Sequence, residues 1–268
     1  MDLSDNWLQL LAESIGPIDS VRPMSSAMWR LNAAGIPVVA KRGPSITDEA
    51  DGLRLLASVA GGPGVPKILY ENEDLLVIEW IEPSRQSPGH EDRLGRELAA
   101  LHAVVAPCWG SGSSWVGQCP IDPICFGDGP DFYRARLVEL ARRCGLEEQV
   151  ATLAEKITDL VPFDSPSHLH GDLWWGNIIW GTGERPWLID PSCHGGHPEE
   201  DLAMLGLFGA VPGRLIDAYL EVRPLSEGWA DRVALWQLYP LLVHAVLFGG
   251  HYPAQVKAIA DRYAGRKI

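Results

Sequence analysis

The chain has 268 residues, of which 46% are hydrophobic and 21% charged, so it can build a large core and does not have the composition of a disordered chain. Its 35 acidic and 22 basic residues give a formal net charge of -13. This balance argues against nucleic acid as a partner, because a surface that binds phosphate backbones needs a positive field.

The first third of the chain alternates between helical and strand patterns. A short amphipathic helix is predicted over 6–15, followed by strands over 20–41 on both sides of a turn at 32–35. A second helix follows over 48–60, and two further strands follow over 67–71 and 75–81. After residues 82–84 the patterns are mainly helical, with one loop rich in Gly, Ser, Pro and Cys (helices 94–102 and 131–144, loop 107–130). The sequence therefore predicts a β-rich part over 1–82 and a helical part over 83–268.

No segment predicts a membrane as a partner. The apolar stretch 235–248 contains Gln237, Pro240 and His244 and is too short to span a bilayer, and the acidic first residues lack the basic region of a signal peptide. The cysteines are odd in number and form no C-x-x-C pair, so we expect free thiols in a reducing compartment (Cys108, Cys119, Cys125, Cys144 and Cys193). These features predict a cytoplasmic protein.

Residues 168–191 read as a tight loop followed by a strand, a turn and a second strand. If Trp180 pairs with Trp187 across this hairpin, the same register puts Asn177 opposite Asp190. Directly opposed residues in an antiparallel pair have Cα atoms about 4.5–5.5 Å apart. The pattern therefore predicts that one amide oxygen and one carboxylate converge.

Together with Asp172 in the preceding loop, these two residues suit phosphoryl transfer. Asp190 and Asn177 offer hard oxygen ligands to Mg²⁺, which prefers oxygen and keeps substrate phosphates in its shell. Asp172 can accept the proton of an attacking hydroxyl and align that hydroxyl with the γ-phosphate. The alternative for the isolated triplet is an ordinary hairpin with polar ends, since H-x-D-x-x-x-x-N is a loose pattern.

A nucleotide kinase site also needs a strand lysine that pairs with a helix glutamate. Lys41 ends the apolar run 38–40, and Glu49 opens the following helix. We expect Lys41 to hold the α- and β-phosphates of ATP and Glu49 to orient it. A lysine at a strand end is commonplace by itself, so the prediction depends on the downstream triplet.

Two further places are candidates for contacts with the nucleotide. Ser25 and Ser26 fall in the turn between the first two strands, where a loop that covers phosphates belongs, although a plain surface turn has the same composition. The backbone carbonyl of Glu79 and the N–H of Ile81 are placed to pair with adenine at the connector, where an ordinary strand end is the alternative.

Three stretches, 169–177, 188–204 and 237–250, carry a family resemblance. On these residues the chain resembles the fructosamine kinase (ketosamine-3-kinase) family, within the aminoglycoside-phosphotransferase-like and protein-kinase-like fold. The resemblance implies an α+β, two-lobed fold with a β-rich nucleotide lobe and a mainly helical lobe for catalysis and the substrate.

The same resemblance implies an ATP- and Mg²⁺-dependent kinase for a hydroxyl of a ketosamine or related amino sugar. It assigns Asp172 as catalytic base, Asn177 and Asp190 as metal ligands and Lys41 as the phosphate lysine, and it puts two residues on the substrate side (Trp174 and His244). The family's first loop usually has glycines where this chain has Pro23-Met24, which predicts a stiffer loop here.

The residues favour a small-molecule acceptor independently of the family. Only six residues, 192–197, separate Asp190-Pro191 from the helix that begins near Pro198, which leaves no room for a long activation loop. Glu199 and Glu200 suit the positive end of that helix, and either is also a candidate to face a cationic substrate. An antibiotic-modifying, aminoglycoside-type phosphotransferase and a catalytically silent nucleotide-binding module remain as alternatives.

Overall fold

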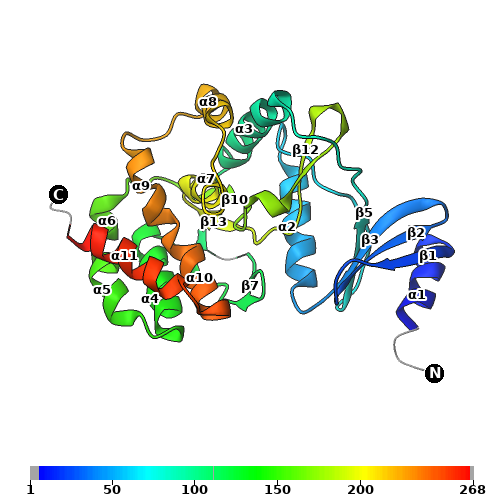
Figure 1. Ribbon diagram of the computed structural model, residues 1–268, viewed down its shortest axis with the longest axis horizontal. Coiled ribbons are helices and arrows are strands. Elements are labelled where there is room, and N and C mark those ends of the chain that lie inside the picture. Colours follow the sequence, from blue (N-terminus) through cyan, green and yellow to red (C-terminus); the bar gives the residue numbers. More distant parts are fainter. Residues whose placement is uncertain (1–5, 111, 266–268) are drawn as a thin grey trace.

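Five strands from the first third of the chain form an antiparallel sheet in the order β1-β2-β3-β5-β4. The structure is a computed structural model that describes residues 6–110 and 112–265. The strands and the two helices that accompany them are α1 (Asn6–Ile15), β1 (Ile18–Pro23), β2 (Met28–Ala33), β3 (Ile36–Arg42), α2 (Ile46–Ser58), β4 (Ile68–Glu71) and β5 (Leu75–Glu79). Figure 1 shows the sheet at one end of the molecule, with α2 between it and the helical part.

The central strands β3 and β5 are buried on both faces of the sheet, and side chains alternate between these faces along a strand. Val38 of β3 packs into a cluster with Leu11 of α1, whereas its neighbour Val39 packs into a cluster with Leu53 of α2. Lys41 lies two residues beyond Val39 and therefore points to the same face as Val39, toward α2. Strand periodicity alone brings the lysine to the side of the sheet that faces the rest of the protein.

Helices dominate the remainder of the chain, as predicted. They are α3 (Pro88–His102), α4 (Gly129–Arg143), α5 (Glu147–Glu155), α6 (Ile157–Leu160), α7 (Glu199–Leu205), α8 (Gly213–Val222), α9 (Trp229–Trp236), α10 (Leu238–Phe248) and α11 (Tyr252–Ala264). Helix α3 packs closely on α8 at Gly95, where a Cβ atom would collide with the carbonyl oxygen of Leu215. No helix in the described ranges is long and apolar enough to cross a membrane.

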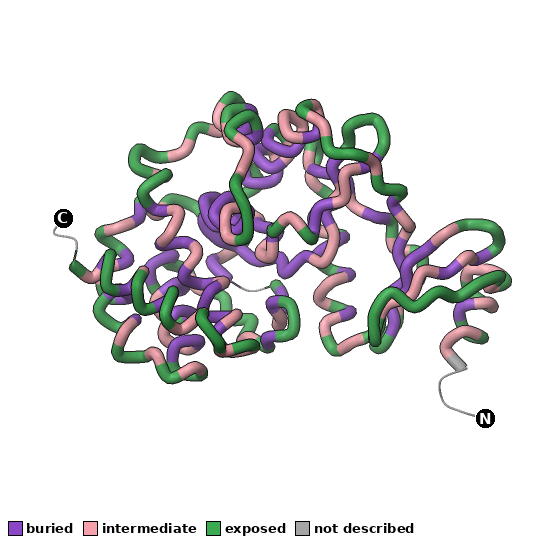
Figure 2. The backbone as a smooth tube through the Cα atoms, in the orientation of Figure 1, coloured by how far each residue is buried: buried purple, intermediate pink, exposed green. Residues whose placement is uncertain are grey.

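Short strands between these helices carry most of the polar residues singled out above. They are β6 (Trp109–Gly110), β7 (Trp115–Val116), β8 (Cys119–Pro120), β9 (Cys125–Phe126), β10 (Ser167–Leu169), β11 (Ile178–Trp180), β12 (Pro186–Leu188) and β13 (His194–Gly196), with 3-10 turns η1 (Trp175–Asn177) and η2 (Thr182–Glu184) on either side of β11. Every residue of β13 and α7 is buried, and Figure 2 shows this stretch in the middle of the helical part. A β-rich first part and a helical remainder are thus confirmed, while the boundary at residues 82–84 stays a prediction.

The predicted register of the β11–β12 hairpin is wrong by one residue. Trp180 pairs with Pro186, not with Trp187, and the residue opposite Asn177 is Ile189, whose N–H donates to the Asn177 carbonyl at 3.0 Å. The two tryptophans have other partners, because Trp187 bridges to Gly64 and Trp180 packs edge-on against the ring of His90.

The prediction that all cysteines are free is also wrong. Cys108, just before β6, and Cys125 of β9 form a disulfide, while Cys119, Cys144 and Cys193 are free. The bridge joins the two ends of the 107–130 segment that was predicted as a loop. This segment contains the short strands β6 to β9, and β6 pairs with both β9 and β13.

Candidate active site

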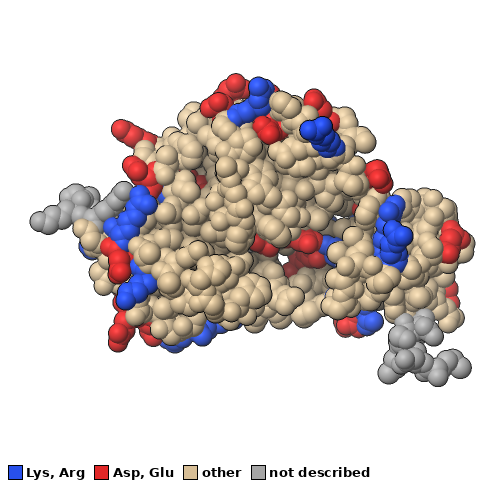
Figure 3. Space-filling view, viewed as in Figure 1, with Lys and Arg blue, Asp and Glu red and all other residues tan. Residues whose placement is uncertain are grey.

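A cleft of about 690 Å³ lies between the sheet and the helical part. One wall comes from β3, α2 and the turn before β2, and the other from the segments around β11 and β12. Figure 3 shows a hollow at this level, with acidic and basic atoms at its wall. The predicted residues that line the cleft are Ser25, Lys41, Glu49, Asp172, Trp174, Asn177 and Asp190.

Lys41 joins the two sides of this cleft. Its Nζ atom lies 2.6 Å from Oε1 of Glu49 on α2 and also forms an ion pair with Asp190 beyond β12. Burial alone would lower the pKa of Lys41, but the two carboxylates raise the pKa above its usual value. The lysine therefore carries a positive charge at the centre of the cleft, held between two anions.

Asp190 lies in an uncommon backbone conformation. Its φ angle is 54°, in the left-handed region that a residue other than glycine seldom occupies. Such outliers persist only where the surrounding structure enforces them, and they cluster at functional sites. About half of its side chain, 46%, is exposed in the cleft, so an oxygen remains accessible to a ligand.

Asp172 and Asn177 are tied together across one turn of the loop. The amide Nδ2 of Asn177 donates to the backbone carbonyl of Asp172 at 2.8 Å and to its Oδ2 atom at 3.2 Å. The turn needs Gly171, whose φ is 80° and where a Cβ atom would collide with the carbonyl oxygen of Ser192. This contact is a local reason for glycine at the position before Asp172.

The carboxyl of Asp172 has a strongly shifted pKa. Burial raises the pKa to about 7, the hydrogen bond from Asn177 works against the shift, and the negative charges of Asp190 and Asp201 add to it. A group with a pKa near neutrality is well matched to accepting a proton at physiological pH.

A buried carboxylate that the sequence did not mark as functional holds this loop in place. Asp201 on α7 accepts hydrogen bonds from the backbone N–H of His170 at 2.8 Å, from that of Gly171 at 3.0 Å, and from Nε2 of His102 at 3.1 Å. Burial alone would raise its pKa, but the bond and charge of His102 hold the pKa below its usual value. The ring of His170 accepts from the N–H of Asp172 and so supports the backbone of the same loop.

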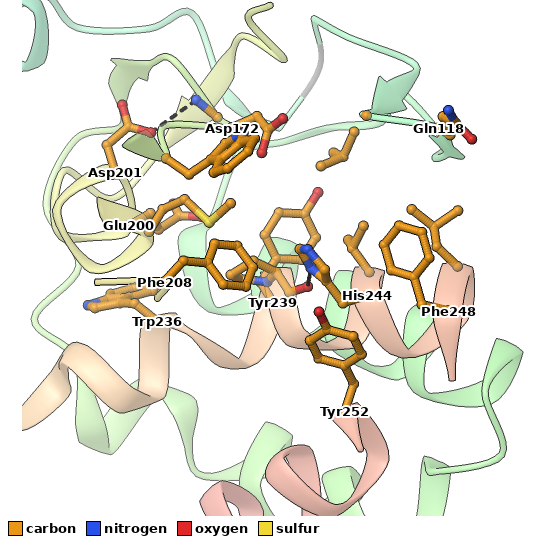
Figure 4. A pocket seen from close by; sticks show the side chains of 18 of the residues that line it. Gln118, Asp172, Glu200, Asp201, Phe208, Trp236, Tyr239, His244, Phe248 and Tyr252 are labelled. Atoms are coloured by element: carbon orange, nitrogen blue, oxygen red, sulfur yellow. Dashed lines mark hydrogen bonds between the residues drawn. The ribbon is translucent and has the colours of Figure 1, made fainter. Parts of the chain in front are cut away.

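A second pocket, of about 400 Å³, opens next to Asp172 on the side away from the sheet (Figure 4). Trp174 and His244, both expected on the substrate side, line it. Further lining residues include Glu200, which the sequence offered with Glu199 as a candidate to face a substrate, and five that it did not assign to a pocket: Gln118, His194, Phe208, Phe248 and Tyr252. The residue type alone does not predict that a polar or aromatic side chain lines a pocket, and only the fold brings these six together.

Glu199 lies elsewhere, contrary to the expectation that it faces a substrate. Its carboxylate is buried and binds the guanidinium of Arg232 at 2.5 and 2.9 Å and the indole N–H of Trp236 at 2.7 Å. The next residue along α7, Glu200, lines the pocket in its place. Because successive helix residues differ in direction by about 100°, only one of the two faces the pocket.

Of the remaining residues predicted to contact the nucleotide, only one lines the cleft. Ser25 lines the cleft, but Ser26 lines a separate shallow hollow with Glu73 and Asp74. Glu79 and Ile81 lie at the connector and do not line the cleft. The structure thus gathers Lys41, Glu49 and the downstream triplet around one space, and it leaves three of the predicted contacts outside it.

The comparison with known proteins decides the family. The model of the fructosamine kinase family matches residues 40–265. The chain belongs to the fructosamine kinase family. A probable ketoamine kinase of Enterococcus faecium is 32% identical over 228 residues, which cover 80% of this chain and 81% of the relative. A candidate fructosamine-3-kinase from Thermobifida fusca, known from a crystal structure, is 34% identical with a TM-score of 0.87 over 96% of this chain and 97% of that one.

This fructosamine kinase family member is a phosphotransferase that acts on a hydroxyl group. Its fold is shared more widely. An aminoglycoside phosphotransferase in complex with streptomycin and ATP is 16% identical, with a TM-score of 0.68 over 98% of each chain. The predicted protein-kinase-like fold is therefore confirmed.

Proposed function

We propose that this fructosamine kinase family member transfers the γ-phosphate of ATP, with Mg²⁺, to a hydroxyl of a ketosamine or a related amino sugar. The observation that carries the proposal is the convergence of Lys41, Asp172, Asn177 and Asp190 on one cleft beside a second pocket. Solved neighbours with the same fold hold ATP or AMP, which supports ATP as the phosphate donor.

The nucleotide would occupy the cleft on the side of the sheet. Lys41 would bind the α- and β-phosphates, and Glu49 would keep the lysine charged and oriented. Lys41 lies between two carboxylates, which hold its ammonium group in position for the phosphates. Ser25, at the edge of the same cleft, would contact the phosphates from the turn before β2.

The donor set fits a magnesium ion bound together with a nucleotide. Asp190 offers a partly exposed carboxylate, and Asn177 uses Nδ2 for Asp172, which leaves its amide oxygen for a ligand. No group of three or more His, Cys, Asp or Glu side chains forms a metal site in the described part of the chain. Mg²⁺ held partly by substrate phosphates needs only one or two protein ligands, so these two residues suffice. When bound, the ion would neutralise charge on the phosphates.

Asp172 would act as the catalytic base. Its carboxylate would take the proton of the acceptor hydroxyl as the bond from that oxygen to the γ-phosphorus forms and the bond from phosphorus to the β–γ bridging oxygen breaks. The products are ADP, the phosphorylated acceptor and a proton on Asp172. Asp201 would act only as a positioning residue, because it holds the backbone of the loop on which Asp172 lies.

The test is ADP release with a panel of ketosamines, amino sugars and aminoglycosides. We expect turnover with a ketosamine, and its loss in Asp172→Ala and Asp190→Ala, while the circular dichroism spectrum stays that of the folded protein. Asp159→Ala, at an exposed position on α6, is the matched control and should keep full activity. Full activity in either site variant, or phosphorylation of aminoglycosides but of no ketosamine, would contradict the proposal.

A further inference from the structure

The pocket beside Asp172 has two chemically different ends (Figure 4). Asp172, Asp201 and Glu200 lie toward one end, where the reacting hydroxyl would be. The aromatic side chains of Phe248 and Tyr252 lie toward the other, and Phe208 lies between the two ends. A ligand that fills the whole pocket must match both ends.

The polar end contains a buried nitrogen whose hydrogen-bonding capacity is not used. His194 Nδ1 donates to the carbonyl oxygen of Ser192 at 3.1 Å, which makes Nε2 the acceptor in the neutral ring. Burial lowers the pKa of His194, which favours that neutral form. Nε2 has no hydrogen-bond partner among the described residues, and the Oε2 atom of Glu200 is 3.7 Å away. Nε2 is therefore an acceptor for a donor that a ligand would supply, such as a hydroxyl or an ammonium group, beside Glu200, whose pKa burial raises well above its usual value.

The aromatic end is built from rings that contact one another. The ring centroid of His244 lies 4.9 Å from that of Tyr252, 5.2 Å from that of Phe208 and 5.6 Å from that of Phe248. Phe248 is 64% exposed and Phe208 47% exposed, although both line the pocket. Large aromatic side chains exposed side by side at the mouth of a pocket are typical of a surface that an apolar group covers.

The charge of the pocket is one-sided. The described residues that line it include no lysine or arginine, and of its three acidic residues only Asp201 has a lowered pKa, whereas burial raises the pKa of Asp172 and of Glu200. Lys41 lines the other cleft and is paired there with Glu49 and Asp190. A carboxylate on the ligand would therefore be desolvated without a partner, whereas an ammonium group is favoured by the acidic groups and the faces of the rings.

We propose that the acceptor of this enzyme is a ketosamine whose amine carries an uncharged arylalkyl substituent, with the aryl group on the rings of Phe208, Phe248 and Tyr252. The inference rests on the proposed function and adds a substrate class to it. The sugar hydroxyls and the secondary ammonium lie at the polar end, where His194 Nε2 accepts a hydrogen bond from one of them and the carboxyl group of Glu200 lies beside it. Ketosamines of free amino acids, which carry an α-carboxylate, are poor substrates.

Three ketosamines separate the contributions of the ring and of the carboxylate. The fructose adduct of 2-phenylethylamine has the ring and no carboxylate, that of phenylalanine adds only the carboxylate, and that of methylamine lacks both. We expect kcat/KM for the phenylethyl compound to be at least about tenfold above that of each of the other two. An equal or higher kcat/KM for the phenylalanine adduct or the methylamine adduct overturns this inference and leaves the proposed function intact. Failure of all three, with saturating ATP and Mg²⁺, overturns both.

Substitutions at Phe248 then test where the substituent lies. Phe248→Ala should lower the phenylethyl-to-methyl ratio of kcat/KM by about fivefold or more. Phe248→Arg adds a cation at an exposed position and should raise the phenylalanine-to-phenylethyl ratio by a similar factor. Val222→Ala, an exposed apolar side chain on α8 outside the pocket, is the control and should leave both ratios unchanged. Unchanged ratios in both Phe248 variants contradict the assignment of the aromatic end.

Discussion

Replacement of Asp172 by asparagine should make the nucleotide-free protein more stable at the same time as it abolishes turnover. Burial holds the pKa of this carboxyl at about 7 in the folded chain, against 3.8 for an ordinary aspartate. At any pH above 4 the unfolded chain releases the proton more readily than the folded one. The folded state therefore loses stability as the pH rises from about 4 to about 7, and asparagine, which cannot ionise, avoids that loss.

The difference between the two pKa values sets the size of the effect. The gap is roughly three pKa units, and one unit corresponds to about 1.4 kcal/mol, so the ceiling is about 4 kcal/mol above pH 7. The amide is nearly the same size as the carboxyl, and its oxygen can still accept from Nδ2 of Asn177. Water entering the cleft reduces the gain, so we expect about 1–4 kcal/mol at pH 8, or roughly 2–10 °C in melting temperature.

Thermal unfolding of both proteins at several pH values between 4.5 and 8, with a chelator and without nucleotide, measures this gain. The difference in melting temperature should be smallest at the lowest pH, should grow up to about pH 7 and should then level off. Asp159→Asn, at an exposed position on α6, should show a difference of about 1 °C or less at every pH. A variant that is less stable than the parent at pH 8, or a difference that does not change with pH, would refute the assignment of a neutral-range pKa to Asp172.

Three further outcomes follow from the same geometry. Between pH 6 and 8, kcat/KM for the acceptor should rise with pH, because Asp172 must be deprotonated to act as a base; a fall over this range would exclude that role. Asp201→Asn should lower the free energy of unfolding by about 3 kcal/mol or more and kcat by at least tenfold, because it disturbs a buried charge that fixes the loop. KM for ATP should stay within about threefold of the parent value. Thermal unfolding measures the first effect, and steady-state kinetics of ADP release measure the others. The double variant Cys108→Ala/Cys125→Ala removes the disulfide, which closes a loop with a sequence separation of 17 that contributes pocket residues. KM for the acceptor should rise several-fold, and the free energy of unfolding should fall by up to about 3 kcal/mol. An unchanged KM would mean that the bridge does not order the pocket wall.

The polar triplet could be found from the sequence, although the hairpin register used to argue for it was wrong. The order of the residues along the chain fixes Asp172, Asn177 and Asp190 near one end of a short hairpin, and a shift of one residue does not separate them. Pairing Trp180 with Trp187 assumed that aromatic residues meet across the hairpin. Trp187 instead packs beside Gly64, a contact between segments far apart in the chain that no local pattern reveals.

Sequence reasoning failed where the result depends on packing between distant segments. Glu199 and Glu200 are adjacent and chemically alike, and only the docking of α9, with Arg232, decides that the first is paired and the second faces the pocket. The Cys108–Cys125 bridge likewise depends on the pairing of β6 with β9, which are too short to give a strand pattern.

The left-handed backbone conformation of Asp190 decides which substitutions would stabilise the protein at this position. Glycine or asparagine would relieve the conformational strain there, and either would remove the negative charge from the cleft. Thermal selection alone would therefore tend to replace a residue that the proposed catalysis needs, and we expect such variants to be stable proteins without turnover.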